Sequence, residues 1–182
     1  SHPRSFELAN KLVPLFPDDM NHVFFCNSGS EAVDSAMKIA LQYHASRGEG
    51  GRNVFVSRDR AYHGVNIGGT SLSGLMKNRQ GFNAMVPGVV HMRSTFDPEQ
   101  RYSMGQPLLR GEELADDLLR IVQTHGAKSI AACFIEPIAG STGVLVPPVG
   151  YLERIRALCD EHEILMVMDE VLTGFGRTGA AF

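Results

Sequence analysis

A Ser-Gly-Ser segment, Ser28 to Ser30, lies between an apolar run and an amphipathic run of the sequence. If a helix begins there, its free backbone N–H groups and the positive end of its dipole would attract a phosphate group. The glycine, Gly29, would let such an anion approach the main chain closely. Serine and glycine also cap many ordinary helices, so a plain helix cap is the alternative interpretation.

Two carboxylates follow strongly apolar runs: Glu136 ends the run SIAACFIE, and Asp169 follows the run ILMVM. Ligands in open α/β sheets bind at the carboxyl ends of strands. A buried carboxylate at such a place needs a cation or a hydrogen-bond donor as its partner, whereas one that points to solvent needs nothing. The pair Tyr62-His63 has the same two interpretations, as site residues or as a loop aromatic beside a surface imidazole.

Residues 174–179, GFGRTG, match the dinucleotide-binding pattern G-x-G-x-x-G. That pattern binds a dinucleotide only where a helix opens at the glycines. A nicotinamide-dependent oxidoreductase is therefore a rival hypothesis, and it predicts a helix directly after Gly179. The sequence contains no P-loop, no H-E-x-x-H and no G-x-S-x-G, and no Cys/His cluster has zinc spacing, so we expect no metal site.

The composition is typical of one globular domain: 182 residues, of which 43% are hydrophobic and 20% charged. A net charge of −3 without a basic block disfavours nucleic-acid binding. No apolar run approaches the ~20 residues of a membrane span, and the N-terminal residues lack the apolar core of a secretory signal. Three cysteines without a C-x-x-C pair favour a reducing compartment, so we expect a cytoplasmic protein.

Apolar periodicity predicts alternating helices and strands, as in a doubly wound α/β sheet. Ser28 and Glu31 have the spacing of a capping box that opens a helix ending at the glycines of 48–51. The stretch 61–81 mixes turns with a short helix. The other helices are expected over 5–15, 112–125 and 151–163, and the strands over 22–26, 53–57, 89–92, 129–136 and 164–171, the strands near 130 and 165 being parallel.

In this order, the segments HVFFCNSGSEA, RAYHG, FIEPIAGSTG and VMDEVLTGFGRTG resemble the class III aminotransferases, which use pyridoxal 5'-phosphate (PLP). The stretches YHGVNIGGTSL and GVLVPPVGYL are most similar to the omega-amino acid:pyruvate (β-alanine:pyruvate) members. The resemblance implies a three-layer α/β/α fold of the aspartate-aminotransferase type (PLP fold type I) with a mostly parallel sheet. Residues 1–182 would form an incomplete part of the large PLP-binding domain.

The resemblance also implies a role for each polar segment. Gly29 and Ser30 match the loop whose N–H groups hold the PLP phosphate, and Tyr62 matches the aromatic residue that stacks on the pyridine ring. Asp169 matches the carboxylate that pairs with the pyridine nitrogen, which keeps the ring an electron sink. Val171 would press on the opposite face of the ring.

Two further residues are placed on the substrate side of the ring, Glu136 and His63, although a structural hydrogen bond is the plainer role for His63. The family also uses a Schiff-base lysine, which we expect beyond Phe182 because none of the four lysines matches its position. The small domain of the family would likewise lie outside these residues. We therefore expect no catalytic residue and no transaminase activity in residues 1–182 alone.

By resemblance, the parent protein is a homodimeric transaminase that moves an amino group from an amine or omega-amino acid to a keto acid such as pyruvate. Its partners would be small molecules, the amino donor and the keto-acid acceptor. Two alternatives stay open. The protein could be another PLP enzyme of the same fold, such as an aminomutase, or the chain could be a truncated, non-catalytic fragment.

Overall fold

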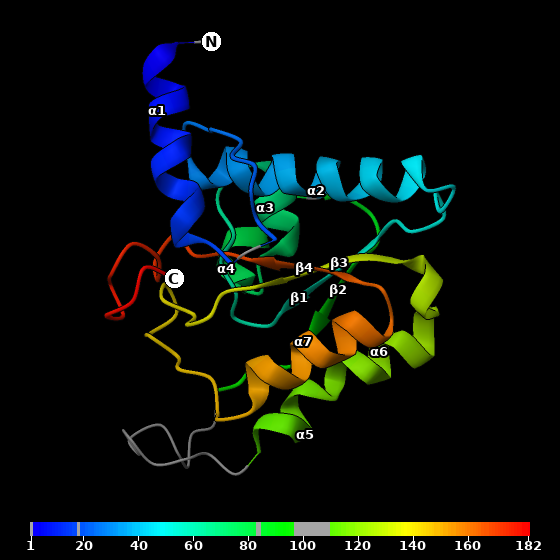
Figure 1. Cartoon of the computed structure of the whole chain (residues 1–182). Helices are drawn as coiled ribbons and strands as arrows, with labels where there is room; N and C mark the ends of the chain where they lie inside the picture. The colour runs from blue at the N-terminus through cyan, green and yellow to red at the C-terminus, as the bar shows by residue number, and fades with distance from the viewer. Residues whose placement is uncertain (1, 18, 83–84, 97–109) are drawn as a thin grey trace.

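The computed structural model describes residues 2–17, 19–82, 85–96 and 110–182. Seven helices and two short 3-10 turns alternate with four strands in these ranges (Figure 1). The strands are β1 (Val54–Arg58), β2 (Val89–Met92), β3 (Ile130–Ile135) and β4 (Leu165–Met168). The helical elements are α1 (Pro3–Leu12), η1 (Val13–Leu15), α2 (Gly29–Ser46), α3 (Ile67–Leu72), α4 (Met76–Arg79), α5 (Gly111–Ala115), α6 (Asp117–His125), η2 (Ala127–Ser129) and α7 (Tyr151–Glu161).

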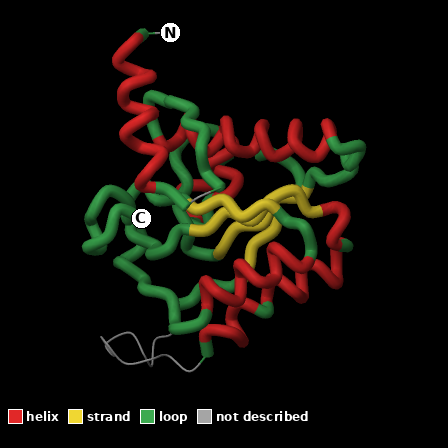
Figure 2. Tube along the Cα trace, in the orientation of Figure 1, coloured by secondary structure: helices red, strands yellow, loops and turns green. Residues whose placement is uncertain are grey.

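The four strands form one parallel sheet in the order β2-β1-β3-β4. Helices α2 and α3 cover one face, and α6 and α7 cover the other, with α5 beside α7 (Figures 1 and 2). All six residues of β3 are buried, because this central strand has helices on both faces. The predicted three-layer α/β/α architecture with a parallel sheet is confirmed.

The parallel arrangement brings the carboxyl ends of β1, β3 and β4 to one edge of the sheet, and α2 begins at the same edge. Ser28 caps α2 as predicted, because its Oγ accepts a hydrogen bond from the N–H of Glu31 at 3.2 Å. The carboxylate of Glu31 reaches back to the N–H of Asn27, at 2.9 Å, one residue before the cap. Both bonds fix the direction in which α2 leaves the sheet edge.

One strand prediction is wrong. Residues 22–26 are apolar, but they have no hydrogen-bonded neighbour strand among the described residues, and the Phe24 side chain is 69% exposed. Apolar side chains make a strand only where another strand satisfies the main chain, so this run stays irregular.

Other expected elements form with changed bounds. The helix predicted over 5–15 ends at Leu12 and continues as η1, and the one over 112–125 is interrupted at Asp116. The strand predicted over 164–171 ends at Met168, which leaves Asp169 immediately after it. Two short helices form between residues 61 and 81 instead of one. Within the described ranges, no helix has the length and apolar character that crossing a membrane requires.

Candidate functional site

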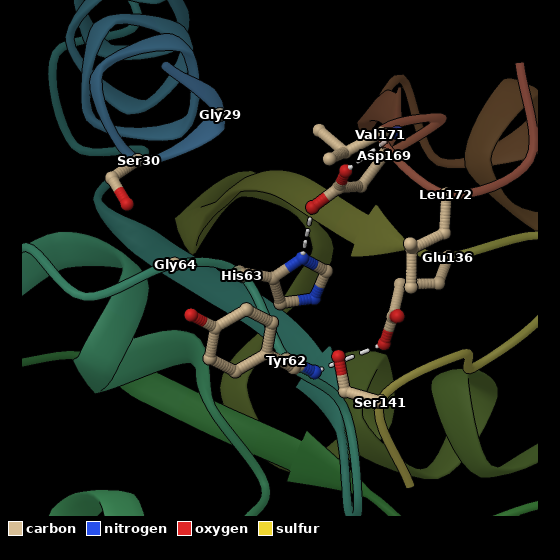
Figure 3. Close-up of a pocket in the computed structure, with 10 residues that line it drawn as sticks. All are labelled: Gly29, Ser30, Tyr62, His63, Gly64, Glu136, Ser141, Asp169, Val171 and Leu172. Atoms are coloured by element: carbon tan, nitrogen blue, oxygen red, sulfur yellow. Dashed lines mark hydrogen bonds and ion pairs between the residues drawn. The ribbon is translucent and has the colours of Figure 1, made fainter. Parts of the chain in front are cut away.

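A pocket of about 230 Å³ opens at the carboxyl edge of the sheet, in front of the start of α2. It brings together all seven residues that the sequence placed at a ligand site, from four separate segments of the chain. Figure 3 shows these residues together with three that the motifs had not singled out: Gly29, Ser30, Tyr62, His63, Gly64, Glu136, Ser141, Asp169, Val171 and Leu172.

The anion-attracting end of the pocket is the first turn of α2. Gly29 and Ser30 are its first two residues, and the main-chain N–H groups of a first turn have no partners within their helix. The Oγ of Ser30 accepts a hydrogen bond from the N–H of Val65 at 3.0 Å, which ties the helix start to the loop after β1. The helix therefore presents free donors and a positive dipole end to the pocket.

Two glycines leave space that a side chain would fill. A Cβ atom at Gly29 would lie 2.9 Å from Cγ2 of Val171. Gly64 has a φ of +103°, and a Cβ there would lie 2.5 Å from Oγ of Ser30. Both the close approach and the left-handed backbone at Gly64 require glycine. Gly64 follows directly on Tyr62-His63, so the RAYHG motif could have indicated it.

The central polar contact joins His63 and Asp169. Nδ1 of His63 lies 2.8 Å from Oδ2 of Asp169, and the imidazole is 1% exposed. Because a carboxylate only accepts hydrogen bonds, Nδ1 of His63 carries the hydrogen and donates the hydrogen bond to Asp169. The N–H of Val171 also donates to Asp169, to Oδ1 at 3.2 Å. These two donors fix the orientation of the Asp169 carboxyl group in the pocket.

Glu136 is a second carboxyl group in the pocket. It is 4% exposed, and its Oε1 accepts a hydrogen bond from the main-chain N–H of Tyr62 at 2.9 Å. Burial raises the pKa of Glu136, and the hydrogen bond from Tyr62 only partly opposes this shift. In Figure 3 the pair of His63 and Asp169 lies between Val171 and Tyr62.

The four lysines lie on other parts of the molecule. Lys11 is on α1, Lys38 on α2 and Lys77 on α4, and none of them lines the pocket. Lys128 pairs with Glu49 and Glu163, two carboxylates outside the pocket. Among the described residues, those that line the pocket therefore carry carboxyl groups, an imidazole and hydroxyl groups, but no amine.

The segment 174–179 forms successive turns, and no helix opens at its glycines. The structural context that a dinucleotide fingerprint requires is missing, so the segment does not support the rival hypothesis of a nicotinamide-dependent oxidoreductase. In the part of the chain that the structure describes, no three His, Cys, Asp or Glu side chains are grouped as a metal site.

Comparison with known proteins gives consistent matches. The family model described as aminotransferase class III matches residues 1–182. The omega-aminotransferase of Caulobacter vibrioides is 52% identical over 182 residues, which are 100% of this chain and 41% of that protein. The omega-amino acid–pyruvate aminotransferase of Pseudomonas putida is 49% identical over 181 residues, 100% of this chain and 40% of that protein.

Solved structures match over the whole chain as well. An (S)-enantioselective omega-transaminase from Thermomicrobium roseum has a TM-score of 0.90 and 36% identity, and this chain covers 40% of it. An omega-transaminase from Pseudomonas jessenii, solved in complex with PMP, has a TM-score of 0.91 and 38% identity, again with 40% of that chain covered. The present chain therefore spans about 40% of the length of the relatives it matches.

Proposed function

The chain belongs to the class III aminotransferases, and from this premise we propose that the protein binds PLP in the pocket at the sheet edge and acts as an omega-transaminase. It would transfer an amino group from an amine or omega-amino acid to a keto acid such as pyruvate. The family membership predicted from the sequence motifs is confirmed. The similarity to an omega-amino acid–pyruvate aminotransferase supports the substrate class.

The pocket fits a phosphate at one end. Gly29 and Ser30 begin an 18-residue helix, so free N–H groups and the helix dipole face the space that the glycines keep open. Their N–H groups would bind the PLP phosphate. The hydrogen bond from Val65 to Ser30 would fix the loop after β1 beside this helix start.

The pocket also fits a protonated aromatic nitrogen. The observation that carries the proposal is the hydrogen bond from His63 to Asp169, because it fixes a carboxyl group inside a pocket that begins at a helix N-terminus. Asp169 would pair with the pyridine nitrogen, and Tyr62 and Val171 would contact the two faces of the ring. When bound, PLP supplies an electron sink for the negative charge that forms when a substrate loses its Cα proton.

No lysine lines the pocket among the residues described, so we propose that the lysine that binds PLP covalently comes from outside residues 1–182. These residues would form part of the large domain of a homodimer. Exposed apolar side chains support this arrangement, since Val65 and Phe175 offer surface that further protein could cover. Residues 1–182 alone would show no transaminase turnover.

An absorbance titration with PLP, followed by borohydride reduction and peptide mass mapping, tests the proposal. Residues 1–182 and the protein expressed from its full reading frame are compared side by side. We expect trapped PLP on one lysine of the longer protein, outside residues 1–182, and alanine formation from pyruvate with that protein only. Trapping on Lys11, Lys38, Lys77 or Lys128, or turnover by residues 1–182 alone, would contradict the proposal.

A further inference from the structure

We propose that Glu136 is a positioning residue: its carboxyl group holds the main chain of Tyr62, and thereby the Tyr62 ring, at the edge of the pocket. This differs from the substrate-side role that the resemblance implied for Glu136. The part of the inference that concerns ring stacking rests on the proposed function. The contact between Glu136 and the Tyr62 main chain does not.

The contact is specific in its atoms. Oε1 of Glu136 accepts the N–H of Tyr62 at 2.9 Å, and the two residues are 74 positions apart in the chain. Glu136 follows β3 and Tyr62 follows β1, so this bond joins the ends of two neighbouring strands. Glu136 as a whole is 4% exposed, so water has little access to the acceptor side of this bond.

The residues on either side of Tyr62 are held in other ways. The N–H of Ala61 donates to the carbonyl of Arg58 at 3.0 Å, and the carbonyl of Ala61 accepts from the N–H of Gly74 at 2.9 Å. On the other side, the N–H of Val65 donates to Ser30. Tyr62 lies between these anchors, and the side chain of Glu136 supplies the acceptor for its main chain.

Arg58 holds Glu136 in turn. Its side chain is buried, and Nη2 donates to the main-chain carbonyl of Glu136 at 3.2 Å. The guanidinium carbon lies 5.7 Å from the centroid of the Tyr151 ring, within the range of a cation–π contact. The positive charge of Arg58 acts to lower the pKa of Glu136, which opposes part of the larger effect of burial. Its buried Nη1 has no hydrogen-bond partner among the described residues.

A positioning role and a chemical role make different demands on the carboxyl group. Oε1 can accept an N–H whether the group is protonated or ionised, and the amide oxygen of glutamine can do the same. Proton transfer requires a titratable group, and pairing with a substrate cation requires a negative charge. Glutamine therefore preserves the proposed role of Glu136 and removes both alternatives.

The test measures hydrogen–deuterium exchange over residues 59–64, together with PLP affinity, in the protein expressed from its full reading frame. The variants are Glu136→Gln and Glu136→Ala. Asp117→Ala is the matched control, since Asp117 is a buried carboxylate that accepts a main-chain N–H, that of Arg93, outside the pocket. Exchange is recorded without PLP, so that it reports on the contact alone.

We expect Glu136→Ala to exchange about 3- to 10-fold faster at Tyr62 and to bind PLP more weakly by a similar factor, as for the loss of one hydrogen bond. Glu136→Gln should stay within about twofold of the parent in both measurements. Asp117→Ala should speed exchange at Arg93 and leave Tyr62 unchanged, which separates a local effect from general destabilisation.

Two results would overturn the inference. One is unchanged exchange at Tyr62 in Glu136→Ala, and the other is a Glu136→Gln variant as impaired as Glu136→Ala. If the alanine variant does not fold, faster exchange at Tyr62 in Glu136→Gln would by itself contradict the inference, because glutamine keeps the acceptor oxygen. If the parent itself fails to bind PLP, the proposed function fails, while the exchange data still test the contact between Glu136 and Tyr62.

Discussion

His63 and Asp169 are 106 positions apart in the chain, yet Nδ1 of the histidine lies 2.8 Å from Oδ2 of the aspartate inside the pocket. Each residue follows a strand of the parallel sheet, β1 for the histidine and β4 for the aspartate. The central strand β3 separates these two strands. The bond therefore spans the sheet edge and gives the pocket a carboxylate of fixed orientation.

Replacement of that carboxylate should affect turnover much more than stability. Asp169→Asn keeps the size of the side chain but removes the charge that would face the pyridine nitrogen. We expect transaminase turnover to fall by at least about 100-fold, as for other losses of a preorganised electrostatic contact. Steady-state alanine formation measures the effect. Glu170→Gln is the matched control, because Glu170 is the adjacent carboxylate and does not line the pocket; an equal loss in both variants would contradict the assignment.

Substitution by alanine should destabilise the protein more at Gly64, which lines the pocket, than at Gly48, which lies in open space. Gly64→Ala requires a strained backbone and places Cβ 2.5 Å from Oγ of Ser30. Gly48 also has a positive φ, of +78°, but no atom lies within 4 Å of an added Cβ. We expect Gly64→Ala to lower the free energy of unfolding by about 1 to 3 kcal/mol more than Gly48→Ala, measured by urea denaturation. Equal losses of unfolding free energy in the two variants would contradict the view that the contact with Ser30 requires glycine at position 64.

The contact between Gly29 and Val171 predicts a compensating pair of substitutions. In Gly29→Ala the added Cβ would lie 2.9 Å from Cγ2 of Val171, so one of the two pocket walls must shift. We expect PLP affinity to fall about 10-fold, and Val171→Ala in the same protein to restore most of it. A double-mutant cycle on the PLP dissociation constant measures this coupling. Additive losses would mean that the two residues act independently.

Glu136 and Asp117 should give opposite pH dependences of stability. Burial raises the pKa of Glu136 above its ordinary value of 4.5, so the folded state binds this proton more tightly than the unfolded state. The contribution of this Glu136 proton to the free energy of unfolding is fully present below pH 4.5, and it is lost as the pH rises through the folded-state pKa. Burial also acts to raise the pKa of Asp117, but hydrogen bonds from Arg120 and the N–H of Arg93 outweigh it and lower the pKa below 3.8.

The contribution of Asp117 is therefore present above pH 3.8 and is lost as the pH falls through the lower folded-state value. Relative to the parent, Glu136→Gln should become more stable as the pH rises from 4.5 to 7. Asp117→Asn should be less stable than the parent at pH 7, and this difference should shrink toward pH 3. Urea unfolding at a series of pH values checks both, and parallel trends for the two variants would refute the assignment.

Apolar runs before Glu136 and Asp169 predicted strands near residues 130 and 165, and both strands form, although the second ends at Met168 and not at residue 171. The residue pattern alone left open whether the two carboxyl groups point into a site or to solvent. It did not reveal that His63 donates to Asp169, since a bond across 106 positions depends on the strand order β1-β3-β4. Nor did it indicate Ser141 or Leu172, whose positions at the pocket follow from loops without periodic patterns.

Local patterns failed where packing decides the outcome. Residues 22–26 have the composition of a buried strand, but a strand also needs a neighbour, and Phe24 is exposed. The helix over 112–125 has a continuous apolar face and is nevertheless interrupted at Asp116. There Asp116 pairs with Arg154 of α7, and Asp117 accepts the N–H of Arg93 after β2, so tertiary contacts set the break.

The assembly of the pocket from four distant segments has a consequence for folding kinetics. Bonds such as those from His63 to Asp169 and from Tyr62 to Glu136 close long loops, and contacts of this kind form late and slow the search for the native topology. Local helices such as α2 can form early, but the ligand pocket exists only once β4 has docked beside β3. Capture of PLP during refolding would therefore report the end of that search, and the ligand would stabilise only chains that have completed it.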